Sequence, residues 1–154
     1  MKIAIYPGSF DPITIGHLDI LKRALVVFDK VIVLIAINPN KKYHFSPKER
    51  VEMIKAAVKG LDNVEVDYTD GLTVKYAKEH GAKHLIRGLR AVTDFEYEFQ
   101  LAAANEYVDQ DIDMVFFMAR NEKSFINSST VMQLKENGVD VSNLVPESVI
   151  KYLK

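Results

Sequence analysis

The stretch "KIAIYPGSFDPITIGH" (residues 2–17) decides the fold expected for this chain. It begins with an apolar run typical of a strand buried on both faces, and it ends where an amphipathic helical pattern starts. The loop between them contains Gly8 and Gly16, which let backbone N–H groups and a helix N-terminus approach an anion. His17, in the first turn of the helix, is expected to donate a hydrogen bond to that anion. The alternative is that the glycines only turn the chain and His17 caps or packs.

The alternation of strand and helix continues to the end of the chain. Four more apolar runs predict strands at 30–38, 64–68, 84–87 and 114–118. Leu18, Leu21 and Leu25 share one helical face, and capping boxes at 46–49 and 93–96 begin two further helices. The glycines at 81 and 138 stand where helices are expected to end. We therefore expect a single domain (1–154): an α/β, Rossmann-like, doubly wound five-stranded parallel sheet with helices on both faces.

The predicted helix over 94–108 is apolar on two stripes. Tyr97 and Leu101 belong to one stripe, and Phe95 and Phe99 belong to the other. A helix that is apolar on two faces is usually buried on two sides. Two interpretations stay open: a helix of the core, or a helix that meets another subunit or a ligand.

The composition excludes several classes of protein. The 154 residues are 48% hydrophobic, and 20 Lys+Arg against 21 Asp+Glu give a net charge of −1. We expect no nucleic-acid partner and no membrane partner, because such proteins usually carry a basic excess. The chain has no cysteine, which excludes disulfides, thiolate nucleophiles and Cys-ligated zinc. No apolar run approaches the roughly 20 residues of a membrane span, and the N-terminus lacks a signal-peptide pattern. A cytoplasmic protein is therefore expected.

Basic and hydroxyl residues follow the ends of the predicted strands, where open α/β sheets bind ligands. Lys41 and Lys42 follow the second strand, although a lysine pair is often only solvated. Arg87 and Arg90 follow the fourth strand, and guanidinium groups bind phosphate oxygens in pairs. The segment 122–130, after the fifth strand, is expected to cap a helix and to form a second anion site. The sequence thus predicts a crevice for several phosphate groups, without a catalytic triad or a protein metal cluster.

These motifs together resemble one family. "PGSFDPITIGH" (7–17), "NPNKK" (38–42), "RGLRAVTDFEYEFQ" (87–100) and "SFINSS" (124–129) resemble bacterial phosphopantetheine adenylyltransferases in order and spacing. These enzymes belong to the nucleotidyltransferases marked by a (His/Thr)-x-Gly-His motif, here residues 14–17. That motif alone is weak, but it is specific when joined to "RGLRAVTDFEYE". The resemblance covers essentially the whole chain.

The resemblance implies transfer of AMP from ATP to 4′-phosphopantetheine, which gives dephospho-coenzyme A and pyrophosphate in coenzyme A biosynthesis. It implies three catalytic residues: His17, Lys41 and Arg90. It assigns ATP binding to Ser9, Phe10, His17, Gly88, Leu89, Arg90, Glu98, Lys123, Ser124, Phe125, Ile126, Asn127, Ser128 and Ser129. It assigns phosphopantetheine binding to Ser9, Lys41, Thr73 and Arg87. Many relatives have serine where this chain has Asn127, which is still able to cap or donate.

The resemblance also implies Mg²⁺ bound mainly through the ATP phosphates, a homohexamer, and feedback inhibition by coenzyme A. The acceptor phosphate is itself a nucleophile, so we expect direct in-line attack on the α-phosphorus. His17 and Lys41 would bind the pentavalent centre, and Arg90 would bind the β- or γ-phosphate. Three alternatives stay open: a nucleotidyltransferase with nicotinamide mononucleotide or glycerol 3-phosphate as acceptor, a class I aminoacyl-tRNA synthetase, and a sensor that binds ATP or coenzyme A without turnover. The chain is short for a synthetase.

Overall fold

Five parallel strands form one sheet in the computed structural model, which describes residues 1–154 except for the side chains of Val92 and Thr93. The strands are β1 (Ile3–Gly8), β2 (Lys30–Ala36), β3 (Val64–Thr69), β4 (His84–Leu89) and β5 (Asp113–Met118). They lie in the order β3-β2-β1-β4-β5, and every neighbouring pair is parallel. The predicted Rossmann-like α/β fold is therefore confirmed.

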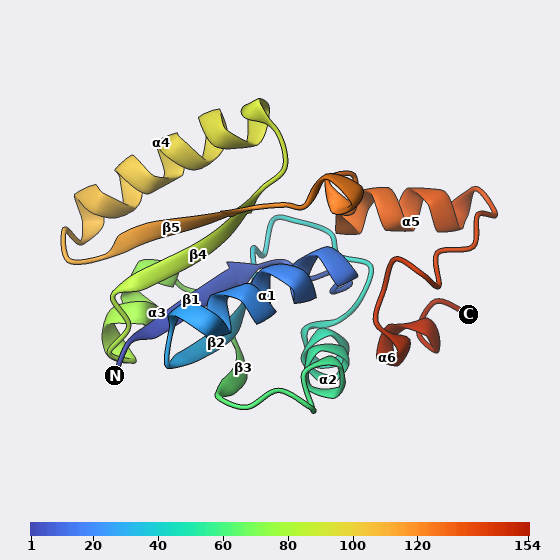
Figure 1. Ribbon diagram of the computed structural model, residues 1–154, viewed down its shortest axis with the longest axis horizontal. Helices are drawn as coiled ribbons and strands as arrows, with labels where there is room; N and C mark the ends of the chain where they lie inside the picture. Colours follow the sequence, from blue (N-terminus) through green and yellow to red (C-terminus); the bar gives the residue numbers. More distant parts are fainter.

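Helices connect the strands and extend the chain beyond the sheet. They are α1 (Ile15–Val27), α2 (Pro47–Ala57), α3 (Thr73–Glu79), α4 (Val92–Val108), the 3₁₀ turn η1 (Asn121–Lys123), α5 (Ser128–Glu136) and α6 (Glu147–Ile150). Figure 1 shows α3 and the N-terminus at one end of the molecule, with α5, α6 and the C-terminus at the other. The described helices include none with both the length and the apolar content needed to cross a bilayer.

Two apolar clusters cover the two faces of the sheet. Ala4 and Tyr6 of β1 belong to one cluster, together with buried residues of α1 and α2. Ile5 belongs to the other cluster, together with Val74 and Ala77 of α3. Successive residues of a strand point to opposite faces, so a strand covered on both sides must be apolar at nearly every position. This burial explains the continuous apolar runs of the sequence.

The helix boundaries follow local sequence signals, with one correction. Ser46 and Glu49 form the predicted reciprocal capping box at the start of α2. Gly81 and Gly138 both have positive φ angles, +70° and +79°, as the residues that end α3 and α5. The predicted start of α4 is wrong by two residues, because the helix begins at Val92 with Ala91 as its N-cap. The predicted capping role of the Thr93 side chain lies outside the described residues.

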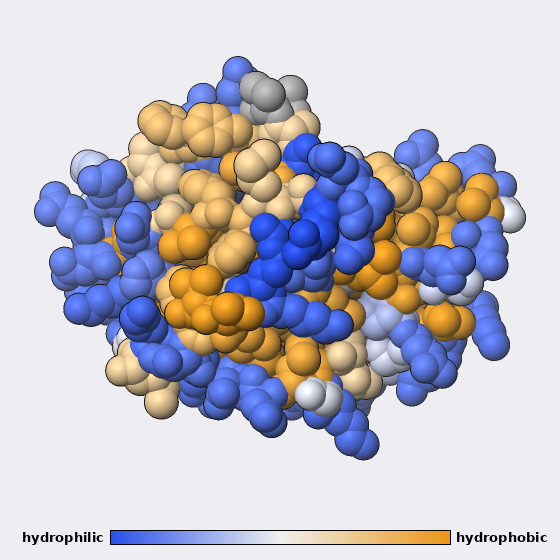
Figure 2. Space-filling view, in the orientation of Figure 1, coloured by the Kyte–Doolittle hydropathy of each residue, from blue (hydrophilic) through white to orange (hydrophobic). Residues whose placement is uncertain are grey.

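The apolar surface of α4 is largely uncovered in the single chain. Phe99 is 64% exposed and Tyr107 is 92% exposed, and Phe95 and Tyr97 are exposed as well. Figure 2 shows apolar side chains gathered over the region of α4 and β5, next to a hydrophilic band. The interpretation of α4 as a core helix buried on two sides is therefore wrong for the isolated chain. Both stripes contain exposed residues: Tyr97 in the first, and Phe95 and Phe99 in the second.

Candidate active site

A cavity of about 700 Å³ opens at the carboxyl ends of β1 and β4, where the strand order reverses. It brings together most of the residues that the sequence predicted for the site. Those that line it are Ser9, Phe10, His17, Lys41, Thr73, Arg87, Gly88, Arg90, Glu98, Lys123, Ile126, Asn127, Ser128 and Ser129. Leu89, Ser124 and Phe125 do not line it, and Phe125 is 53% exposed.

The hydrogen bonds of the helix cap fix the tautomer of His17. The backbone N–H of Thr14 donates to His17 Nδ1 at 3.0 Å, and the His17 N–H donates to Thr14 Oγ1 at 3.3 Å. Because Nδ1 accepts from a backbone amide, the proton of the neutral ring is on Nε2. Burial, together with the positive charges of Arg90 and Arg87, lowers the pKa of His17 to about 3. At neutral pH, His17 is therefore an uncharged donor through Nε2–H.

In the first turn of α1, the backbone N–H groups on either side of Gly16 are used by hydrogen bonds. The Ile15 N–H donates to the Leu144 carbonyl at 3.1 Å, while that of His17 is used by the cap. Gly16 lies between them and lines the cavity. A Cβ at Gly16 would lie 3.3 Å from the carbonyl oxygen of Ile126. The absence of a side chain thus allows the helix N-terminus and the segment before α5 to approach each other closely, as an anion site requires.

The loops after β1 and β2 meet through Ser9 and Lys41. Lys41 Nζ lies 3.3 Å from Ser9 Oγ, and it also lies 5.5 Å above the centre of the Tyr43 ring. Lys42 is exposed and is not part of the cavity wall. The structure therefore separates the two lysines, which the sequence did not: Lys41 reaches the cavity and Lys42 is solvated.

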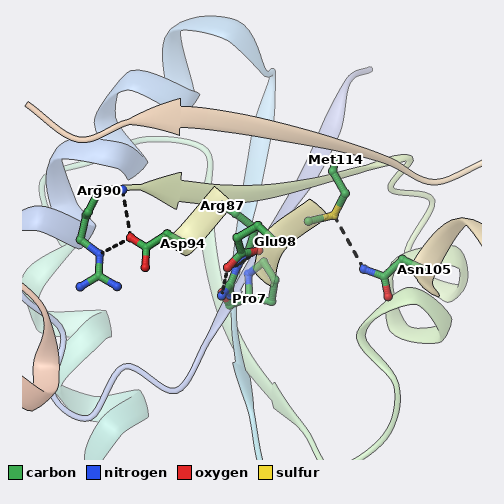
Figure 3. Close-up of polar contacts among 7 residues, drawn as sticks. All are labelled: Pro7, Arg87, Arg90, Asp94, Glu98, Asn105 and Met114. Atoms are coloured by element: carbon green, nitrogen blue, oxygen red, sulfur yellow. Dashed lines mark hydrogen bonds and ion pairs between the residues drawn. The ribbon is translucent and has the colours of Figure 1, made fainter. Parts of the chain in front are cut away.

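Arg87 is held by a buried carboxylate (Figure 3). Its Nε donates to both Glu98 oxygens at 3.1 and 3.0 Å, and Nη2 donates to Oε1 at 2.7 Å. Nη1 donates to the Pro7 carbonyl at 3.0 Å, which ties the fork to β1. Burial lowers the pKa of Arg87, but the hydrogen bond and charge of Glu98 outweigh this and raise it. In this structure the carboxylate of Glu98, predicted for ATP binding, orients Arg87.

Two further cations at the cavity also have carboxylate partners. The backbone N–H of Arg90 donates to Asp94 Oδ2 at 3.1 Å, and its Nε lies 3.3 Å from the same oxygen (Figure 3). Lys123 Nζ lies 3.7 Å from Oδ1 of Asp19, which also lies 3.4 Å from Arg120 Nε. Neither Asp94 nor Asp19 was predicted. Asp19 also pairs with Arg23 one turn along α1 at 3.4 Å, a spacing visible in the sequence, but Arg120 and Lys123 are about a hundred residues away and have no such local signal.

Asn127 begins α5. Its Oδ1 accepts a hydrogen bond from the Thr130 N–H at 2.8 Å, so the predicted capping role is confirmed. Ser128 Oγ donates to the Pro12 carbonyl at 2.8 Å, which fastens the start of α5 to the loop after β1. Asparagine therefore acts as the N-cap of α5 at this position.

The far end of the cavity is apolar, and the sequence indicated it only through the interpretation that the helix over 94–108 meets a ligand. It is lined by Leu72, Val74, Leu85, Leu101, Val108 and Met114. Asn105 adds one amide, whose Nδ2 lies 3.7 Å from Met114 Sδ (Figure 3). Tyr97 and Leu101, which form one apolar stripe of the predicted helix, both line the cavity. The site therefore has a cationic end and an apolar end.

The amino-acid sequence of the chain is similar to proteins of a known family. Residues 5–134 match the cytidylyltransferase-like family. A phosphopantetheine adenylyltransferase from Lachnoclostridium phytofermentans is 48% identical over 99% of this chain and 94% of the relative. Others with that name, from Thermotoga neapolitana and Clostridium novyi, are each 50% identical over 98% of this chain and 94% of the relative. The chain belongs to the phosphopantetheine adenylyltransferase family. The predicted family is thus confirmed.

A solved structure supports the fold of the family member. A protein from Vibrio parahaemolyticus, assigned as a nicotinate-nucleotide adenylyltransferase, aligns with a TM-score of 0.71 at 22% identity. The alignment covers 99% of each chain. At this identity the similarity concerns the architecture of the sheet and its helices.

The described residues offer no ready-made site for a resident metal ion. No group of three or more His, Cys, Asp or Glu side chains comes together in that part of the chain. Asp94, a carboxylate at the cavity, is already paired with Arg90. A Mg²⁺ ion would therefore have to find most of its oxygen ligands outside the protein, on phosphates and water.

Proposed function

We propose that the enzyme transfers AMP from ATP to 4′-phosphopantetheine, with release of pyrophosphate and formation of dephospho-coenzyme A. The observation that carries this proposal is the division of a single cavity into a cationic end and an apolar end. The cationic end suits the phosphates of both substrates. The apolar end, with the amide of Asn105, suits the pantetheine arm, which has two amides and a gem-dimethyl group. The names of the relatives point to the same acceptor.

The reaction needs no protein nucleophile. An oxygen of the acceptor phosphate attacks the α-phosphorus of ATP and forms the new P–O–P bond. The bond between the α-phosphorus and the bridging oxygen of the β-phosphate breaks, and pyrophosphate leaves with that electron pair. The protein has to align two anions and stabilise the charge that develops at the α-phosphate.

The side chains around the cavity support distinct roles. His17 donates through Nε2–H to the pentavalent centre, because its Nδ1 is occupied by the Thr14 amide. Lys41 adds a positive charge next to Ser9. Arg87 holds the acceptor phosphate, and Arg90 holds the β- or γ-phosphate of ATP. Each of these donors is fixed by the fold before the substrates arrive, which is what electrostatic stabilisation of a transition state requires.

Mg²⁺ enters as part of the substrate MgATP in this proposal. It reduces the charge of the leaving pyrophosphate, while the described residues bind the phosphates directly. Coenzyme A contains the same pantetheine arm and an adenosine group, so it fits the same cavity as a feedback inhibitor. A cytoplasmic location and independence from nucleic acids and membranes are part of the proposal.

A homohexamer is also proposed, with the outer face of α4 as a contact between copies. The exposed Phe95, Phe99 and Tyr107 support it, because apolar patches of this kind usually mark interfaces. Sedimentation velocity tests it. Phe99→Lys is expected to reduce the sedimenting mass, and an unchanged hexamer would place the contact elsewhere.

The primary test is Mg²⁺-dependent release of pyrophosphate from ATP with rival acceptors. Release with 4′-phosphopantetheine, accompanied by dephospho-coenzyme A, is the expected result. Release with nicotinamide mononucleotide instead would keep the chemistry and change the acceptor. Tight binding of ATP without release from either acceptor would contradict the proposal and favour a nucleotide sensor.

A further inference from the structure

Arg50 is a fully buried arginine outside the wall of the cavity. It lies on α2, its exposed fraction is 0%, and it is among the largest side chains that are completely enclosed. Arginine is seldom buried without a charged partner, because removing a guanidinium from water is costly. The described residues include no ion pair to Arg50, and its Nε and Nη2 have no hydrogen-bond partner among them. Such a position calls for a specific reason.

The two contacts of Arg50 reach the two loops that meet at the cavity. Its Nη1 donates to the Ser9 carbonyl at 2.8 Å, in the loop after β1. Its guanidinium carbon lies 4.1 Å above the centre of the Tyr43 ring, in the loop after β2. Arg50 thus fixes the position of one loop relative to the other without lining the cavity itself.

Tyr43 connects Arg50 to Lys41, which lies in the same loop as Tyr43. The Tyr43 hydroxyl accepts a hydrogen bond from the Asn38 N–H at 2.8 Å, and Lys41 Nζ lies over the same ring. Asp11 fastens the end of this loop, since its two oxygens accept from the N–H groups of His44 and Phe45. Burial lowers the pKa of Arg50, and the charge of Asp11 opposes that change.

We propose that Arg50 is a positioning residue, which keeps Ser9 and Lys41 at the spacing needed to grip one phosphate group. This inference rests on the proposed function for the identity of that phosphate, the one of 4′-phosphopantetheine. Arginine is required because its planar fork donates to Ser9 and stacks on Tyr43 at the same time. Lysine keeps the charge but offers no flat surface for the ring, and methionine fills the space without either interaction.

The experiment compares Arg50→Met and Arg50→Lys with Met53→Ala. Met53 is buried on the same helix in the apolar cluster and has no described side-chain hydrogen bond to either loop, so its truncation reports a general loss of stability. Arg50→Met is expected to raise KM for 4′-phosphopantetheine about tenfold, the cost of a charge-assisted hydrogen bond that is no longer aligned. KM for ATP is expected to rise less, by no more than about threefold, because most of its expected contacts lie outside the two loops that Arg50 reaches. Arg50→Lys is expected to raise KM for 4′-phosphopantetheine as Arg50→Met does. A wild-type KM in Arg50→Lys would show that the charge alone is needed, and would refute the positioning role.

A double-mutant cycle tests whether Arg50 acts through Lys41. In the Lys41→Ala background, Arg50→Met is expected to raise KM for 4′-phosphopantetheine by clearly less than about tenfold, since one of the two groups it positions is gone. Equal effects in both backgrounds, or an equal rise in KM for Met53→Ala, would overturn the proposal. If Arg50→Met does not accumulate as folded protein, Tyr43→Leu serves in its place, because it removes the stacked ring and leaves Arg50 bonded to Ser9.

Hydrogen exchange separates this inference from the proposed function. The Asn38 amide, which is bonded to the Tyr43 hydroxyl, is expected to exchange at least about tenfold faster in Arg50→Met than in Met53→Ala. Equal exchange in the two variants would overturn the role of Arg50 whatever the enzyme acts on. If the wild-type protein shows no turnover with 4′-phosphopantetheine, the proposed function fails, while the exchange result still decides whether Arg50 orders the loop.

Discussion

Glu98→Gln should weaken the fold by a measurable amount, because it removes the counter-charge of Arg87. Arg87 makes three contacts of 3.1 Å or less with the Glu98 oxygens. Removing one partner of a buried ion pair costs about 3–5 kcal/mol. Glutamine keeps one acceptor oxygen, and the Arg87 side chain is 27% exposed, so water compensates part of the loss. We therefore expect the free energy of unfolding to fall by about 2–3 kcal/mol.

Urea unfolding followed by circular dichroism measures this change. With a slope of about 2 kcal/mol per molar urea, the midpoint should fall by about 1 M. Glu96→Gln is the matched control, because it makes the same chemical change at an exposed position of the same helix. Its effect should stay within about 0.5 kcal/mol. All variants are compared at one protein concentration, since self-association would shift the midpoint. If Glu98→Gln were as stable as Glu96→Gln, the Arg87–Glu98 pair would not hold the fold as described.

Other predictions concern His17 and two glycines. His17→Asn should lower kcat about 10²–10³-fold in the pyrophosphate assay, as for loss of one transition-state donor; near-normal turnover would refute the role of Nε2–H. The folded pKa of His17, about 3, lies below its ordinary 6.5, so its contribution to stability is present above pH 6.5 and is lost as pH falls. When the pH is lowered from 7 to 5, the free energy of unfolding should fall by about 2 kcal/mol more for the wild type than for His17→Asn. An equal fall in the two proteins would contradict this. Gly8→Ala would place a methyl group 3.1 Å from the ring of Phe10 and should cost about 1–3 kcal/mol in thermal unfolding. Gly88→Ala, whose new contact of 3.4 Å is with the flexible Ile20 side chain, should cost less than about 1 kcal/mol, and the reverse order would refute this packing argument.

Local signals of the sequence were sufficient for most elements of the fold. The five strands follow from apolar runs, and the start of α2 follows from the Ser46–Glu49 capping box. Long-range contacts have no such signal. The Ile15 amide is bonded to the Leu144 carbonyl, and nothing in either stretch of sequence indicates the other. The strand order was also not specified, because five similar apolar runs are compatible with several arrangements.

The sequence predicted the residue types of the site better than their partners. Basic residues after strands indicated where anions would bind, and Lys41, Arg87 and Arg90 all reach the cavity. The resemblance to the family supplied the reaction and the acceptor. It did not separate residues that touch the cavity from residues that support it. Arg50 stands inside an ordinary amphipathic helix, where an arginine is normally expected to be solvated, and its burial is a property of the tertiary structure.

The pairing of charges at the cavity explains how a chain of net charge −1 offers a site for several phosphates. Arg87 is paired with Glu98, Arg90 with Asp94, and Lys123 with Asp19. These carboxylates hold the cations in place before the substrates arrive, and they lower the cost of bringing like charges together. The phosphate oxygens of a substrate must then share the cations with these carboxylates or displace the carboxylates. The binding free energy is therefore the difference between the cation–phosphate and the cation–carboxylate interactions. Lys41 differs, since its contacts are the Ser9 hydroxyl and the Tyr43 ring. Lys41 can therefore bind an incoming phosphate without first breaking an ion pair with a carboxylate. Binding of the acceptor phosphate then depends on the position of the Lys41 loop, and hence on Arg50.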